Sequence, residues 1–195
     1  AYLVLVLYFQ HAIPLFEGPD EPSHFQHLAF LRVEGRLPKY GAQADVPASP
    51  QPPLYYLLSL PLFAAVVEDA PALLRDLHAV NLSVYRWEDG AIRRSERIRQ
   101  FPRPPNPRLF LHDPALTPLK RVRWTSAIFG AAAVALCFLA ALRLAGDGNL
   151  AALCAGLFAF NPQFLFVSSY ASNDTLSVLV GAGAFYLVAA CAGFG

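Results

Sequence analysis

The stretch WTSAIFGAAAVALCFLAAL, residues 124–142, decides the fold class of this chain. It contains no charged side chain and is bounded by Arg123 and Arg143. With a helical rise of about 1.5 Å per residue, a run of this length matches the thickness of a bilayer core. We therefore predict a transmembrane helix over residues 124–143.

Two more apolar runs follow towards the end of the chain, and we predict spans over residues 150–169 and 175–194. The polar stretch LAGDGN, residues 144–149, separates the first two spans. SSYASNDT, residues 168–175, separates the last two and predicts a turn between antiparallel helices. Pro162 lies inside the middle run, where the missing backbone N–H and the ring should kink the helix.

The composition also argues against a water-soluble globule. Hydrophobic residues make up 55% of the 195 residues and charged residues 15%, whereas a typical soluble domain is about a quarter charged. After Trp124 the charged residues are Arg143, Asp147 and Asp174. Residues 1–16 begin within an apolar run, which we interpret as the end of a first transmembrane helix, so the chain is expected to be the N-terminal fragment of a larger membrane protein. No basic, aromatic-interleaved pattern suggests nucleic-acid binding.

Residues 17–123 carry most of the prolines and nearly all of the charge, and we predict a large loop outside the membrane. Within it, residues 21–35 have the pattern of an amphipathic helix. Residues 53–67 are apolar but short and contain Pro61, which favours a helix lying at the interface over a full span. The Arg-rich stretch 86–108 is expected to be irregular surface. The predicted fold class is thus an all-α integral membrane bundle with several spans and a large first loop.

The position of residues 53–67 also sets the topology. If they do not cross the membrane, two spans separate Asp20 from Asp174, and both acids face the same side. If they cross, the two acids face opposite sides. The excess of Lys and Arg does not decide between these cases, because the positive-inside rule fails for long loops.

The segment GPDEPSHFQHLAFLRVEGRLP, residues 18–38, holds the most informative polar pattern. On a helix Asp20, His24 and His27 would stack on one face, which places a carboxylate and two imidazoles at the membrane surface. The alternative is that Asp20 only caps the helix by accepting bonds from its first N–H groups. Capping alone does not explain the adjacent Glu21.

Two further segments carry candidate side chains. SPQPPLYYLL, residues 49–58, offers Tyr55 and Tyr56, whose rings could contact headgroups or simply belong to an aromatic belt. In FNPQFLFVSSYASNDTLS, Asp174 stands beside Asn173 at the mouth of the last span, either as a functional acid or as a helix cap.

Together these motifs resemble the GT-C superfamily of membrane glycosyltransferases, which use polyprenyl-phosphate sugars. The resemblance rests on PDExxH after the first span, PPLYY some thirty residues later and NPQ…ND between later spans. Their order and spacing relative to the spans are similar to those of the bacterial families related to the protein mannosyltransferases and aminoarabinose transferases. Gln51 departs from some relatives, in which a basic residue or His precedes the Pro-Pro pair.

The resemblance implies an active site on the extracytoplasmic face of a membrane, as in the bacterial cell envelope. It implies that Asp20 is the catalytic base, with Glu21 as its neighbour, and that Asp174 is the acid of a second loop. The full set of residues expected to contact the substrate is His24, His27, Tyr55, Tyr56, Asn173 and Asp174. The expected partners are a polyprenyl-phosphate-linked sugar donor and membrane lipid.

The chemistry of such a transfer agrees with one well-placed carboxylate. A lipid phosphate is already a good leaving group, so a general acid is dispensable, whereas the acceptor hydroxyl needs a base within hydrogen-bond reach. The leaving phosphate needs positive charge or fixed donors, for which His24, His27 and the loop arginines are candidates. Attack from the face opposite the leaving group would give inversion, by analogy with inverting glycosidases.

Other functions stay open on the sequence alone. The chain could be a non-catalytic transporter or lipid-binding scaffold in which Asp20 and Asp174 are only helix caps. A metal-dependent membrane hydrolase would need His24 and His27 to converge on a carboxylate, but HxxH is a weak metal motif. No cofactor is expected, with a divalent metal as the alternative, and the fragment is expected to be inactive alone.

Overall fold

The computed structural model divides the chain into two compact units, each of which is considered by itself. One unit comprises Ala1–Ile13 and Lys120–Gly195, and the other Pro14–Leu119. The residues that the structure describes are 1–13, 15, 18–39, 45–46, 51–67, 69, 85–88, 91–94 and 120–191.

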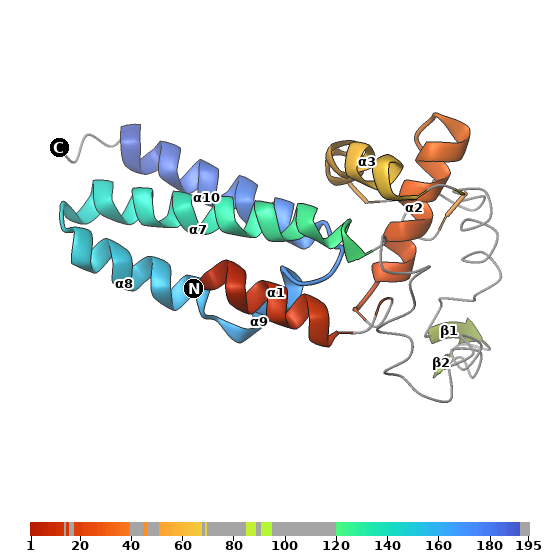
Figure 1. Ribbon diagram of the computed structural model, residues 1–195, viewed down its shortest axis with the longest axis horizontal. Coiled ribbons are helices and arrows are strands. Elements are labelled where there is room, and N and C mark those ends of the chain that lie inside the picture. Colours follow the sequence, from red (N-terminus) through yellow and green to blue (C-terminus); the bar gives the residue numbers. More distant parts are fainter. Residues whose placement is uncertain are drawn as a thin grey trace. The chain divides into compact units, whose positions relative to one another are not determined.

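The first unit is a helical bundle (Figure 1). Its helices are α1 (Tyr2–Ala12), α7 (Arg123–Ala145), α8 (Gly148–Ala159), α9 (Pro162–Val167) and α10 (Asp174–Cys191). Helix α7 packs against α10, α8 and α1, while α9 packs against α1 and α8. Small residues such as Ala127, Ala133 and Ala159 are buried at these contacts, which lets the helix backbones approach closely.

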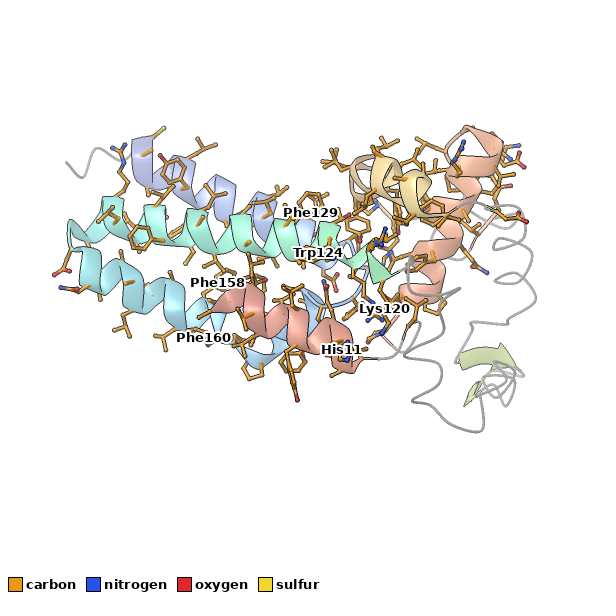
Figure 2. All side chains as sticks on the ribbon, in the orientation of Figure 1. His11, Lys120, Trp124, Phe129, Phe158 and Phe160 are labelled. Atoms are coloured by element: carbon orange, nitrogen blue, oxygen red, sulfur yellow. The ribbon has the colours of Figure 1, made fainter. Side chains whose placement is uncertain are left out.

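Two helices of this bundle are long and apolar enough to cross a membrane, namely α7 and α10. Their bounds lie close to those of the helices predicted over residues 124–143 and 175–194. Only 22% of the apolar window of α7 and 11% of that of α10 is buried, so most of their apolar surface faces outward, unlike the core helices of soluble proteins. Figure 2 shows side chains projecting from these helices, with Trp124 near the start of α7.

The middle span is not the single kinked helix that the sequence predicted over residues 150–169. The chain forms two separate helices, α8 and α9, with Asn161 and Pro162 at the break. The side chain of Asn161 accepts hydrogen bonds from the N–H groups of Gln163 and Phe164 and so starts a new helix. Pro162 occupies the first turn, where its missing N–H costs nothing.

Helix α1 also ends earlier than the predicted boundary at residue 16. Its last residue is Ala12, and Ile13 is extended because it precedes Pro14. The guanidinium of Arg123 donates from Nη1 to the carbonyl oxygens of Gln10 and Ile13, at 3.0 and 2.8 Å. The side chain of Gln10 donates in return to the carbonyl of Arg123 at 3.1 Å. The end of α1 and the start of α7 are therefore joined by reciprocal bonds.

The second unit contains the helix pair α2 (Glu21–Glu34) and α3 (Leu54–Val66), which lie within a residue or so of the predicted helices over 21–35 and 53–67. It also contains an antiparallel ribbon of β1 (Tyr85–Glu88) and β2 (Ala91–Arg94). The prediction of irregular surface over 86–108 did not include this ribbon, and the rest of that stretch lies outside the described residues.

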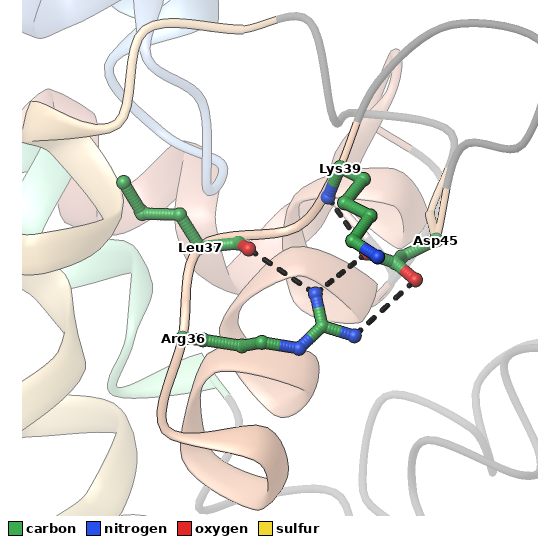
Figure 3. Close-up of polar contacts among 4 residues, drawn as sticks. All are labelled: Arg36, Leu37, Lys39 and Asp45. Carbon is green, nitrogen blue, oxygen red and sulfur yellow. Dashed lines mark hydrogen bonds and ion pairs between the residues drawn. The ribbon is translucent and has the colours of Figure 1, made fainter.

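A polar contact follows the end of α2. Figure 3 shows Arg36 paired with Asp45 at 2.9 Å, while the backbone N–H of Lys39 donates to the same carboxylate at 2.6 Å. The Arg36 guanidinium also lies over the ring of Phe30. These bonds lower the pKa of Asp45, chiefly through the hydrogen bond from Arg36. They fold the chain after Gly35 back towards the helix.

Candidate active site

Asp20 stands at the start of α2 in an unusual backbone conformation. Its φ of 56° and ψ of 0° lie in the left-handed region, which no other described non-glycine residue adopts. Asp tolerates this region better than most residues. Its exposed side chain makes no capping hydrogen bond, and the second helical residue, Pro22, has no N–H to donate. The capping alternative is therefore not what the structure shows, and the carboxylate stays available.

Glu21 behaves differently from its neighbour. Its side chain is fully buried at the first position of α2, whereas that of Asp20 is exposed. Two adjacent carboxylates thus have different surroundings, one facing out and one held within the unit. This is the arrangement expected if one acid reacts and the other supports it.

The sequence predicted an amphipathic helix, but α2 is not amphipathic over its first three turns. The apolar side chains Phe25, Leu28, Ala29 and Leu31 are buried as expected. However, His24, Gln26 and His27 on the other faces are buried too, with 2%, 2% and 1% exposure. Helix α3 packs against α2, and a helical repeat alone does not reveal which residues a neighbouring helix covers.

The buried histidines meet the tyrosines of α3. His24 Nδ1 and the Tyr56 hydroxyl form a hydrogen bond of 2.8 Å, and the His27 ring stacks on the Tyr56 ring at 3.6 Å between centroids. The Tyr55 ring meets both His24 and Tyr56 edge-on. Both tyrosine rings are fully buried, so they do not form an exposed aromatic belt. Their predicted contact with substrate stays a prediction.

The electrostatics of this cluster favour neutral groups. Burial, with a smaller effect of the neighbouring His27, lowers the pKa of His24 to about 4. Burial, followed by the charges of Tyr55 and Asp20, raises the pKa of Tyr56 well above its usual value. His24 is thus uncharged at neutral pH and offers a phosphate no positive charge. No group of three or more metal-binding side chains occurs among the described residues.

Asp174 and Asn173 lie in the other unit, at the start of α10. The N–H of Asp174 donates to Ser172 Oγ at 3.1 Å, so Ser172 takes the role of the cap that Asp174 was considered for. Ser126 of α7 fixes this turn, because its hydroxyl accepts from the N–H of Ser172 and donates to its carbonyl. The Asp174 side chain is left exposed. That Asp20 and Asp174 share one face remains a prediction.

Sequence reasoning missed the bonds that hold these turns. Arg123 is fully buried, although it was interpreted only as the charged boundary of a span. Gln10, inside the first apolar run, was a signal that could have been followed, since polar side chains in a membrane need partners. Ser126 had no such signal, because serine is common in membrane helices.

A comparison with known protein families agrees with the resemblance. Residues 112–192 match the family model of dolichyl-phosphate-mannose-protein mannosyltransferases. The matched part includes α7, α8, α9 and α10 but neither Asp20 nor the tyrosines of α3. No curated protein and no solved structure matches the chain.

The class that the match supports is that of the GT-C membrane glycosyltransferases. Within that class, the family supported over residues 112–192 is that of the protein mannosyltransferases.

Proposed function

We propose that the protein transfers a sugar from a polyprenyl-phosphate carrier to an acceptor hydroxyl on the extracytoplasmic side of a membrane. The observation that carries the proposal is the family match over the helices from α7 to α10. The name of that family specifies a lipid-phosphate mannose donor and a protein acceptor, and we extend the donor class to this chain.

Asp20 is the base in this proposal. Its carboxylate is exposed and is not used as a cap, so it can take the proton of an acceptor hydroxyl. Attack from the face opposite the phosphate inverts the anomeric centre and releases the polyprenyl phosphate. Glu21 is buried beside Asp20 and supports the turn rather than reacting.

The site lies at the membrane surface because α3 is too short to cross. Its 13 residues give a helix of about 20 Å, against about 30 Å for the bilayer core. Its exposed side chains include Leu54, Leu57 and Leu58, which recur on one face and suit acyl chains. With α3 at the interface, two crossings separate Asp20 from Asp174, one by α7 and one by α8 and α9 together. Asp20 and Asp174 then fall on the same side.

The donor class can be tested directly in proteoliposomes. The purified full-length protein is incubated with a labelled acceptor and one of three donors: a polyprenyl-phosphate sugar, the corresponding nucleotide sugar, or a polyprenyl-diphosphate sugar. We expect transfer from the first donor alone and release of free polyprenyl phosphate. Transfer from the nucleotide sugar would contradict the proposal, and lipid binding without any transfer would favour a non-catalytic scaffold.

A further inference from the structure

Tyr56 joins α3 to two successive turns of α2. Its hydroxyl is hydrogen-bonded to His24 at 2.8 Å, and its ring stacks on His27 with 3° between the two ring planes. One buried side chain thus holds α2 by an edge contact and a face contact. Such a double contact fixes both the rotation of α2 about its axis and its distance from α3.

The backbone of His24 is in turn hydrogen-bonded to that of Asp20. Its backbone N–H donates to the carbonyl oxygen of Asp20 at 3.0 Å, across the first turn of α2. Asp20 has a left-handed backbone and no side-chain bond of its own to the helix. A non-glycine residue keeps such a conformation only when its surroundings fix it. The contacts of His24 supply part of that constraint.

We propose that Tyr56 is a positioning residue that holds Asp20 in place through His24 and does not itself contact the sugar donor. This inference rests on the proposed function, in which Asp20 is the base. Tyr56 is fully buried, whereas the side chain of Asp20 is exposed. Asp20 can therefore meet the substrate, while Tyr56 acts from the interior of the unit. A misplacement of a base by about 1 Å is enough to slow a reaction strongly.

The link stays intact over the neutral pH range. Burial keeps Tyr56 protonated and His24 uncharged, so a neutral hydrogen bond joins them when the base is ionised. A charge on His24 would instead be placed beside His27 in a buried site. The hydrogen bond between Tyr56 and His24 therefore keeps one protonation state across the neutral range.

The first test replaces the hydroxyl and keeps the ring. Tyr56→Phe retains the stack on His27 and removes the bond to His24, and we expect kcat to fall about tenfold or more with the donor KM within twofold. The matched control is Tyr8→Phe, because Tyr8 is exposed on α1, and it should leave both constants unchanged. A raised donor KM with unchanged kcat would overturn the proposal, because it would place Tyr56 on the substrate.

The second test asks for rescue at His24. Asn can place an amide near the position of Nδ1, whereas Leu fills the space without a polar atom. We expect His24→Asn to retain most of the turnover and His24→Leu to be as slow as Tyr56→Phe. The double variant that combines His24→Leu with Tyr56→Phe should be no slower than either single variant. Additive losses, or equal activities of His24→Asn and His24→Leu, would contradict the link.

A third readout does not depend on activity. Amide hydrogen exchange of residues 21–28 should be faster in Tyr56→Phe than in the wild type and unchanged in Tyr8→Phe. Unchanged exchange in Tyr56→Phe would overturn the positioning role. If the wild type transferred no sugar from a polyprenyl-phosphate donor, the proposed function would fail, and this measurement would still decide whether Tyr56 fixes the first turn of α2.

Discussion

The two units of the chain bury different kinds of residue. In the helical bundle, small side chains such as Ala127 and Gly130 lie at the helix contacts, and many large apolar side chains, such as Leu157 and Val188, face outward. In the pair of α2 and α3, aromatic rings and histidines are packed between the helices. The bundle has the inverted distribution of a membrane protein, whereas the helix pair keeps a polar, hydrogen-bonded interior of the kind that positions reacting groups.

This difference decides which changes each unit tolerates. In the bundle, stability depends on close backbone approach and on a few buried polar bonds between helices. In the helix pair, it depends on keeping a buried histidine uncharged.

The largest effect on stability is expected from the buried arginine of the bundle. Arg123→Met removes the donors to the carbonyl oxygens of Gln10 and Ile13, and each buried carbonyl left without its partner costs about 1–3 kcal/mol. We expect a loss of about 4 kcal/mol in an SDS unfolding titration. Arg143→Met, at the exposed end of the same helix, is the control and should change little. Equal effects of both substitutions would mean that the Arg123 bonds do not hold α1.

Acidification should weaken the helix pair and spare the bundle. Folding lowers the pKa of His24 from 6.5 to about 4, so His24 binds a proton more readily in the unfolded state than in the folded state. The stability of the helix pair therefore falls as the pH drops from 6.5 towards 4. The loss is at most about 3 kcal/mol. It is measured as faster amide exchange in α2 at pH 5 than at pH 7, after correction for the intrinsic rate. The same acceleration in His24→Asn would show that another group is responsible.

A methyl group at Gly130 should loosen the bundle by a smaller amount. A Cβ there would lie against the Tyr2 hydroxyl and 2.8 Å from Ser168 Oγ, so α1 or the turn after α9 has to shift. Overpacking of this kind costs about 1–3 kcal/mol. Gly130→Ala should therefore melt earlier in detergent, while Gly156→Ala, with open space around it, should not. An unchanged melting temperature for Gly130→Ala would refute the close approach.

The smallest effect is expected at the contact after α2. Arg36 is exposed and Asp45 is half-buried, so water and salt screen much of their attraction. Asp45→Asn should leave the melting temperature unchanged and speed amide exchange at Lys39, whose N–H donates to Asp45. A clear drop in melting temperature would indicate that this segment supports the fold.

The sequence predicted the helices well because apolar runs of the right length are direct signals. The bounds of α2, α3, α7 and α10 lie within a few residues of the predicted ranges. The break at Asn161 was predicted only as a kink, since Pro alone does not tell whether the chain resumes its axis. The side chain of Asn161 decides this by capping α9.

The candidate site was predicted less completely. Spacing placed Asp20, His24 and His27 near one another, but it did not show that the histidines are buried and face α3. A helical repeat reveals which residues share a face and not what covers that face. The difference between exposed Asp20 and buried Glu21 could not be derived either, because it depends on the left-handed backbone at Asp20.

The central claim is that the exposed carboxylate of Asp20 is the base and the buried one of Glu21 is its support. The most direct measurement compares the turnover of Asp20→Asn and Glu21→Gln with the wild type in the full-length protein, using a polyprenyl-phosphate sugar donor and equal amounts of folded protein. We expect Asp20→Asn to lose on the order of a hundredfold or more in turnover, because the base is gone while size and fold are kept. Glu21→Gln should lose less. Wild-type turnover by Asp20→Asn would contradict the account, and an inactive Glu21→Gln beside it would mean that the roles of the two carboxylates are reversed.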